Sequence, residues 1–128
     1  LSLGTDQHAI VDFFEEARAL ELNERLRSGR RGRFSPAELI AAMTRHDSIG
    51  VPDAGRLEAG ARADLVVVGL DSVRTAGTDP AQLVFAAGAP DVRTVLVDGA
   101  VVVDDGVHVL GDVGRMLNDA ITYVWSRT

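Results

Sequence analysis

Apolar residues recur at helical spacing in the first part of the chain. Over residues 13–27 they return every three or four positions among charges, which predicts an amphipathic helix. Asp12 is a suitable N-cap for it and Gly29 a suitable end. The sequence Ser-Pro-Ala-Glu at 35–38 predicts a second helix start, with a capping serine, proline at the first position and glutamate three residues after the cap. Residues 45–53 are expected to form a loop.

From residue 64 onward the pattern changes to that of β-structure. Asp-Leu-Val-Val-Val-Gly at 64–69 predicts a buried strand, and 79–87 predicts a short helix that begins at Asp-Pro. Residues 94–103 are two valine-rich runs around an Asp-Gly pair at 98–99, which is a strong hairpin signal. Residues 107–110 are expected to continue the same ladder.

The last element predicted is a helix that begins after Asp112. Its apolar residues are spaced along one face, and packing in a core is the expected role for them, with binding to a partner as the alternative. These residues are Val113, Met116, Leu117, Ala120, Ile121 and Val124, with Trp125 beside them. Near the other end, the apolar entry at Leu3 runs through Gly4 to an acid at Asp6, as in a barrel strand that delivers a carboxylate.

Composition excludes several classes of protein. Of the 128 residues 46% are apolar, which is enough for a real core. The chain has neither a long apolar run nor a signal-peptide pattern, so we expect a cytoplasmic protein without a membrane partner. The net charge of −6 argues against nucleic acid as a partner. The absence of cysteine excludes disulfides and thiolate zinc sites.

Two stretches resemble the amidohydrolase superfamily, the metal-dependent hydrolases built on a (β/α)8 barrel. Gly-Thr-Asp at 4–6 is similar to the end of the eighth barrel strand. The sequence GRLEAGARADLVVV at 55–68 is similar to the passage from the last barrel helix into a small β-sandwich. In such enzymes both chain ends build the sandwich, and the hairpin at 95–103 would be its closing part.

The resemblance implies an α/β chain with three parts. Residues 1–54 would be the last strand and helices of the barrel, residues 55–110 part of the composite β-sandwich, and residues 111–128 a C-terminal helix. One strand and two helices cannot close a barrel, and the chain has no initial methionine. We therefore expect the C-terminal part of an enzyme, inactive alone. The helices around Phe13 and Leu39 would then leave apolar faces that drive self-association or leave the first residues disordered.

Within the superfamily, residues 14–27 and the sequence Arg-Gly-Arg-Phe at 31–34 look most like the formimidoylglutamate deiminases of histidine degradation. Members of that family hydrolyse N-formimino-L-glutamate to N-formyl-L-glutamate and ammonia with one zinc ion. The resemblance extends from Leu3 to about His108. Gln7 and Ala9 depart from the expected pattern beside the strand-8 acid, where residues face the substrate.

Asp6 is the candidate catalytic residue. An aspartate after a strand is more often a turn or cap residue, but the resemblance assigns Asp6 to the metal and to the nucleophilic water. In that role it accepts the proton of the water and passes it to the leaving amine. Zinc lowers the pKa of bound water to about 7, and a neighbouring carboxylate can act as the base.

The remaining polar residues have weaker assignments. His8, two positions beyond the acid, is a candidate substrate contact, although a surface role is the alternative. His46 and His108 lack the spacing of a metal site. Asp64 is expected to bond nearby backbone, and the acids at 98, 104 and 105 to serve in turns.

Two alternatives stay open. One is a different amidohydrolase, such as a cytosine or guanine deaminase or a triazine-type chlorohydrolase, because the residues that separate these enzymes lie on earlier strands. The other is a non-catalytic α+β module that mediates oligomerisation through the hairpin and the final helix. In the leading interpretation the partners are a small-molecule substrate and further copies of the same chain.

Overall fold

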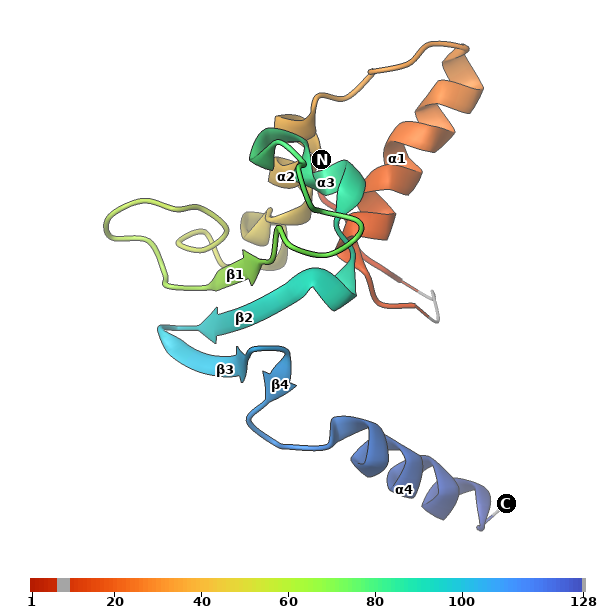
Figure 1. Ribbon diagram of the computed structural model, residues 1–128, viewed down its shortest axis with the longest axis vertical. Helices are drawn as coiled ribbons and strands as arrows, with labels where there is room; N and C mark the ends of the chain where they lie inside the picture. The colour runs from red at the N-terminus through yellow and green to blue at the C-terminus, as the bar shows by residue number, and fades with distance from the viewer. Residues whose placement is uncertain (7–9, 128) are drawn as a thin grey trace.

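The computed structural model describes residues 1–6 and 10–127. Three helices, α1, α2 and α3, pack together beside a four-stranded antiparallel sheet, and a fourth helix, α4, extends away from both (Figure 1). None of the helices in this part of the chain is long and apolar enough to cross a membrane.

The first two helices begin and end where the sequence predicts. Helix α1 spans Phe13–Ser28, with the Asp12 side chain accepting from its first N–H groups, and Gly29 ends it at φ 68°. Helix α2 spans Pro36–Met43. Ser35 and Glu38 form a complete capping box at its start, in which each side chain accepts from the backbone N–H of the other residue.

A small core joins the three helices. Helix α3 spans Leu83–Ala86 and follows a 3-10 turn at Pro80–Gln82. Ala17 of α1, Leu39 of α2 and Val84 of α3 are fully buried against one another. The expectation of an open apolar face is therefore wrong for Leu39 itself, which packs against α3, whereas Phe13 and Ile40 are each 39% exposed. Around this cluster pack partly buried side chains, namely Leu3, Phe14, Leu20, Phe34 and Met43.

The sheet has the simplest antiparallel order, β1-β2-β3-β4. Its strands are Leu65–Val68, Val92–Val97, Ala100–Asp104 and Val107–His108. The predicted hairpin is confirmed, since Val97 pairs with Ala100 across the turn. Asp98 and Gly99 have φ values of 51° and 79°, the left-handed pair that a two-residue hairpin of matching twist requires.

The sheet is less buried than the sequence predicts. Strand β1 was expected to be a buried strand, yet Val66 is 60% and Val67 51% exposed. The described residues form one sheet, so they do not provide the second layer of a sandwich. A strand with apolar residues on both faces can be buried only when both faces are covered.

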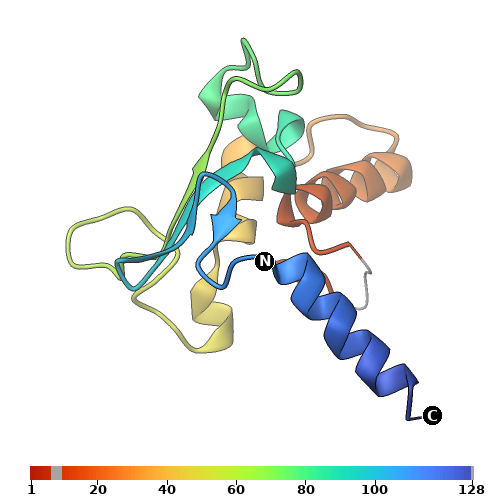
Figure 2. The same cartoon turned by 60° about the horizontal axis from the view of Figure 1, so that its bottom comes forward.

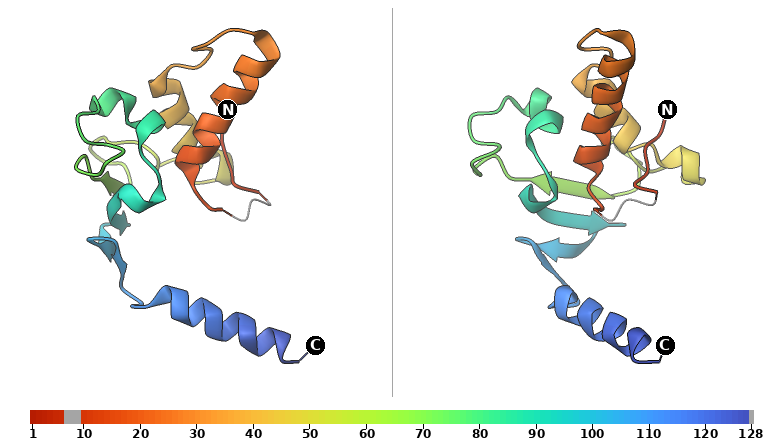
Figure 3. Two further views of the ribbon diagram at one scale, coloured as in Figure 1. Left: turned by 45° about the vertical axis from the view of Figure 1, so that its right-hand side comes forward. Right: turned by 90° about the vertical axis from the view of Figure 1, so that its right-hand side faces the viewer.

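Helix α4 spans Val113–Trp125 and is capped by Asp112, which accepts from the Arg115 N–H at 2.9 Å. The expectation that its apolar stripe packs in a core is wrong, because no residue of α4 is buried. The chain leaves β4 in an extended connection and carries the helix away from the sheet and from α1 (Figures 2 and 3). The apolar stripe of α4 is therefore exposed to solvent.

Two further expectations were inexact. Residues 1–6 form no strand, because the one backbone hydrogen bond described between them and the rest of the fold runs from the Leu3 N–H to the Ala42 carbonyl at 3.2 Å. A strand needs a ladder of such bonds to a neighbouring strand. The predicted loop at 45–53 contains a 3-10 helix at His46–Ile49, which Gly50 ends at φ 84°.

Candidate functional site

Asp6 lies at the end of the first segment, exposed and in a turn. Its φ of 47° is in the left-handed region, which aspartate adopts more readily than most residues. The Leu3 N–H···Ala42 bond joins the segment in front of it to the end of α2. An exposed carboxylate at this position is accessible to a ligand, and its catalytic and metal-binding roles stay predictions.

The two described histidines, His46 and His108, do not join Asp6 in a group able to hold a metal ion. His8, the candidate substrate contact, lies outside the described residues. The His46 Nδ1 is 2.7 Å from the Thr44 carbonyl oxygen, and the Leu110 N–H donates to Nδ1 of His108 at 3.0 Å. Both rings are thus engaged by local backbone, in the helical part and the sheet respectively.

The described residues do not make up a zinc centre. Residues 1–6 and 10–127 contain no group of three or more His, Asp or Glu side chains able to hold a metal ion. Zinc sites take three or four protein ligands. Asp6 can supply one carboxylate oxygen to such a site, and a complete ligand set would need residues other than those described.

A shallow hollow of about 290 Å³ lies where the end of α2 meets residues 52–56. Its two arginines, Arg45 and Arg56, already pair with neighbouring carboxylates. Asp6 is not among the residues that line it. The hollow therefore does not combine with the predicted catalytic acid into one site.

The basic loop at 30–33 is held by a buried acid that the sequence did not indicate. Glu21 is 2% exposed and accepts from the Gly32 N–H at 2.7 Å and the Phe34 N–H at 3.0 Å. The Phe34 bond is the main cause of the lowered pKa of Glu21. The loop lies at the far end of α1 from Asp12 (Figure 1), and the 16 residues of α1 span about 24 Å. Its arginines are therefore remote from the start of α1, and all of them are exposed.

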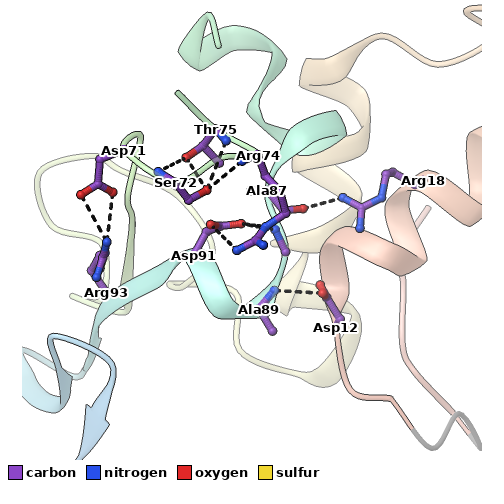
Figure 4. A network of polar contacts seen from close by, with 11 residues as sticks. Asp12, Arg18, Asp71, Ser72, Arg74, Thr75, Ala87, Ala89, Asp91 and Arg93 are labelled. Carbon is purple, nitrogen blue, oxygen red and sulfur yellow. Dashed lines mark hydrogen bonds and ion pairs between the residues drawn. The ribbon is translucent and has the colours of Figure 1, made fainter. Parts of the chain in front are cut away.

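A network of polar contacts connects α1 with the start of the sheet (Figure 4). At its centre is Asp91, which is 2% exposed and accepts from Arg74 Nε at 3.0 Å and Nη2 at 2.9 Å. The Gly88 N–H donates to the same carboxylate at 2.9 Å. The Arg74 guanidinium is the main cause of a strongly lowered Asp91 pKa, with further hydrogen bonds from Ser72 and Gly88. The Gly88 bond closes the start of a 3-10 helix at Ala89–Asp91, and the three-residue spacing from Gly88 to Asp91 was the sequence signal that could have indicated it.

Two residues from α1 reach the same segment. Asp12 Oδ1 accepts from the Phe14 N–H at 2.8 Å, and its Oδ2 accepts from the Ala89 N–H at 2.9 Å. Arg18 Nη1 donates to the Ala87 carbonyl at 2.5 Å and to the Val84 carbonyl at 3.3 Å. Asp12 was predicted only as a helix cap, so its second contact is a new finding.

Asp64, Asp98 and Asp105 have the structural roles that the sequence predicts, whereas Asp104, predicted in a turn, is the last residue of strand β3. Asp64 Oδ1 accepts from the Asp98 N–H at 2.7 Å, which ties the start of β1 to the hairpin turn. Asp98 and Asp105 lie in turns with positive φ, and Asp104 ends β3. None of these acids belongs to a metal-binding group among the described residues.

Replacing Asp91 by asparagine should lower the midpoint of thermal unfolding by roughly 5–10 °C at pH 7. The amide loses the bidentate pairing with Arg74 while staying buried. Because folding lowers the Asp91 pKa, the stabilisation is complete above the unfolded pKa of about 3.9 and is lost as the pH falls through the folded value. Calorimetry at several pH values should show the difference between the two proteins shrinking below about pH 4. A difference that is constant with pH would contradict this account.

The sequence is similar to a known protein family and to several of its members. The family model described as "Amidohydrolase family" matches residues 1–102. Formimidoylglutamate deiminase of Pseudomonas aeruginosa is 36% identical over 121 residues, which cover 84% of this chain and 26% of that protein. A 5-methylthioadenosine/S-adenosylhomocysteine deaminase of Desulfitobacterium hafniense is 31% identical over 121 residues, covering 91% and 28%.

A solved structure is similar over much of the fold. Atrazine chlorohydrolase TrzN of Arthrobacter aurescens TC1, complexed with zinc, superimposes with a TM-score of 0.73 at 30% identity. The match covers 85% of this chain and 25% of that enzyme. The chain thus spans little more than a quarter of the length of the curated relatives described above.

Proposed function

The chain belongs to the amidohydrolase family, and on that premise we propose that it is the C-terminal part of a metal-dependent hydrolase that cleaves C–N bonds and releases ammonia. The observation that carries the proposal is the match of residues 1–102 to the family. The net charge of −6 also favours a small-molecule substrate over nucleic acid.

In this proposal each part of the chain has a place in a larger enzyme. Residues 1–54 are the end of the (β/α)8 barrel, residues 55–110 are part of a β-sandwich, and residues 111–128 are a C-terminal helix. The exposed faces of Val66 and Val67 support this assignment, because they need a covering layer. The helices α1 and α2 would lie on the outside of the barrel.

Asp6 is the proposed catalytic carboxylate. During hydrolysis, water adds to the carbon of the C–N bond, and one of its protons passes through a carboxylate oxygen of Asp6 to the leaving nitrogen. The second proton, from the hydroxyl group now on that carbon, follows the same route through Asp6 to the same nitrogen. Ammonia departs as the C–N bond breaks, and the carboxylate is regenerated. In the complete protein a divalent metal supplies Lewis-acid chemistry, and Asp6 is the one ligand that we assign to this chain. Zinc is the metal in the solved chlorohydrolase.

The proposed substrate is N-formimino-L-glutamate, which is converted to N-formyl-L-glutamate and ammonia. The 36% identity to formimidoylglutamate deiminase supports it. The 31% identity to a methylthioadenosine/S-adenosylhomocysteine deaminase supports adenosine derivatives as the competing class, and the likeness to TrzN supports chlorotriazines.

A substrate panel on the protein encoded by the whole reading frame tests this choice. We expect ammonia release from N-formimino-L-glutamate with kcat/KM at least about 100-fold above that for the other substrates, because a site built for a polar substrate leaves its groups unpaired with the wrong one. Methylthioadenosine and S-adenosylhomocysteine are assayed for ammonia, and atrazine for chloride. A higher kcat/KM for any of these would reassign the substrate.

The outward apolar stripe of α4 supports a second proposed role, association of identical chains. The apolar positions of α4 have nearly the same spacing in both chain directions. Two copies of the helix can therefore pack antiparallel with the same residues in contact, as a two-fold interface requires. The residues at equal distances from the midpoint between Asn118 and Asp119 are Val113 and Val124, Met116 and Ile121, and Leu117 and Ala120.

We expect light scattering on the 128-residue chain at about 100 µM to give a mass above the 13.6 kDa of the monomer. The double variant Leu117→Asp/Ile121→Asp should return it to a monomer, since two charges enter the stripe. Thr122→Asp, on the opposite face of α4, is the matched control and should leave the larger mass unchanged. A wild-type chain that is monomeric at this concentration would contradict the proposal.

A further inference from the structure

Three successive residues between α3 and β2 are each held by a different side chain. The Ala87 carbonyl accepts from Arg18, the Gly88 N–H donates to Asp91, and the Ala89 N–H donates to Asp12. We call residues 87–89 with these three side chains the joint (Figure 4). Two of the three side chains come from the region of α1 and are separated from their partners by 77 and 69 residues.

The sheet side of the joint is fixed independently of α1. Asp91 is buried and paired with Arg74 through two hydrogen bonds. Next to this pair the Thr75 side chain is fully buried, and the Ser72 N–H donates to it at 3.3 Å. Strand β2 begins at Val92, directly after Asp91. Residues 87–89 are therefore held in place next to the start of β2, and the start of α1 binds to them there.

On the α1 side, a single carboxylate makes both kinds of contact. Asp12 Oδ1 accepts from the Phe14 and Glu15 N–H groups and caps α1, while Oδ2 accepts from the Ala89 N–H. The cap therefore uses one carboxylate oxygen of Asp12 and the Ala89 bond uses the other. The position of the first turn of α1 is consequently set by contacts to residues near the sheet as well as by its own cap.

Asp6 stands between two attachment points of the chain. Before it, the Leu3 N–H donates to the Ala42 carbonyl at the end of α2. After it, the chain enters α1 at Asp12. Because α1 and α2 share the core around Leu39, a shift of the α1 start would move both attachment points relative to each other. Residues 3–6, which end in Asp6, would then shift relative to α1, because Leu3 also packs against the core cluster of Ala17, Leu39 and Val84.

We propose that Asp12 and Arg18 are positioning residues that hold Asp6 in its working place by fastening the start of α1 to the joint. This rests on the proposed catalytic role of Asp6. Neither residue touches the reacting atoms. Their contribution is the placement of the carboxylate, and small misplacements of a reacting group cost large factors in rate.

The decisive variant is Asp12→Asn. Asparagine caps a helix about as well as aspartate, so α1 keeps its start. Its side chain has one acceptor oxygen in place of two, so the cap and the Ala89 bond cannot both be kept. Ser35→Ala is the matched control, because it removes the comparable cap of α2 and leaves the joint intact.

Amide hydrogen exchange followed by NMR on the 128-residue chain tests the coupling without any assay of activity. We expect Asp12→Asn to speed exchange of the Ala89 and Leu3 amides by roughly five- to tenfold, as loss of a local anchor permits local opening. Ser35→Ala should leave the Ala89 amide within about twofold of the wild type. Unchanged exchange at Leu3 in Asp12→Asn would overturn the proposal.

Kinetics of the complete protein give the second test. Asp12→Asn and Arg18→Ala should each lower kcat by roughly 10- to 100-fold with KM within about threefold, while Ser35→Ala stays within twofold of wild-type kcat. An Asp12→Asn protein with wild-type kcat would overturn the proposal. If the wild-type protein releases ammonia from no substrate of the panel, the proposed function fails, and the exchange experiment still decides whether the joint holds the Asp6 segment.

Discussion

Replacing Asp6 by asparagine should lower kcat for ammonia release by the complete protein by roughly 10²- to 10⁴-fold, the usual contribution of a general base. An amide cannot accept the proton of the attacking water near neutral pH. The fold should be unaffected, because Asp6 is exposed and asparagine adopts its φ of 47° as readily as aspartate does. Steady-state kinetics and a thermal unfolding curve on the same preparation check both halves of this result.

Asp98→Asn is the control for that variant. Asp98 is also an exposed aspartate at positive φ, and Asn-Gly forms the same hairpin turn as Asp-Gly. We expect its kcat and its unfolding midpoint to equal those of the wild type. Retention of turnover in Asp6→Asn would remove the catalytic assignment and favour the association module.

Replacing Leu39 by alanine should lower the free energy of unfolding by about 2–5 kcal/mol. Leu39 is fully buried where α1, α2 and α3 meet, and it is among the largest fully buried side chains. The small core has few other apolar contacts to compensate, since the other members of the buried cluster are Ala17 and Val84. Urea unfolding followed by circular dichroism measures the loss.

Leu57→Ala is the matched control, because Leu57 is 86% exposed. It should change the free energy of unfolding by no more than about 0.5 kcal/mol. Equal losses in the two variants would mean that the α1–α2–α3 cluster does not stabilise the fold, and the packing described above would be wrong.

Local signals in the sequence predicted most of the elements. The caps of α1 and α2 and the Asp-Gly turn each depend on a few neighbouring residues, so their chemistry is visible in the chain itself. The same holds for α4, whose Asp112 cap and apolar spacing were both recognisable. Element boundaries therefore agree with the structure to within a few residues.

Burial was harder to predict, because it depends on residues far away in the chain. Leu39 and the α4 stripe both look like core faces in the sequence, yet only Leu39 is buried. The difference is that α3, about forty residues later, covers Leu39, while α4 leaves the fold after β4. The spacing of apolar residues shows which face of a helix is apolar, but it does not show which element packs against that face.

The candidate site was predicted in one respect only. The Gly-Thr-Asp motif singled out Asp6 through a family resemblance, and the family is confirmed. The joint could not be predicted, because Asp12 meets Ala89 and Arg18 meets Ala87 only after folding. The Glu21 carboxylate was missed for the same reason, since its partners are backbone N–H groups of a loop.

The most direct test of the central claim is ammonia release from N-formimino-L-glutamate, measured in parallel for the protein encoded by the whole reading frame and for the 128-residue chain. The account predicts turnover by the complete protein and none by the chain alone, because the described residues include no complete metal site. Ammonia release by the isolated chain, or its absence for the complete protein with every substrate of the panel, would contradict it.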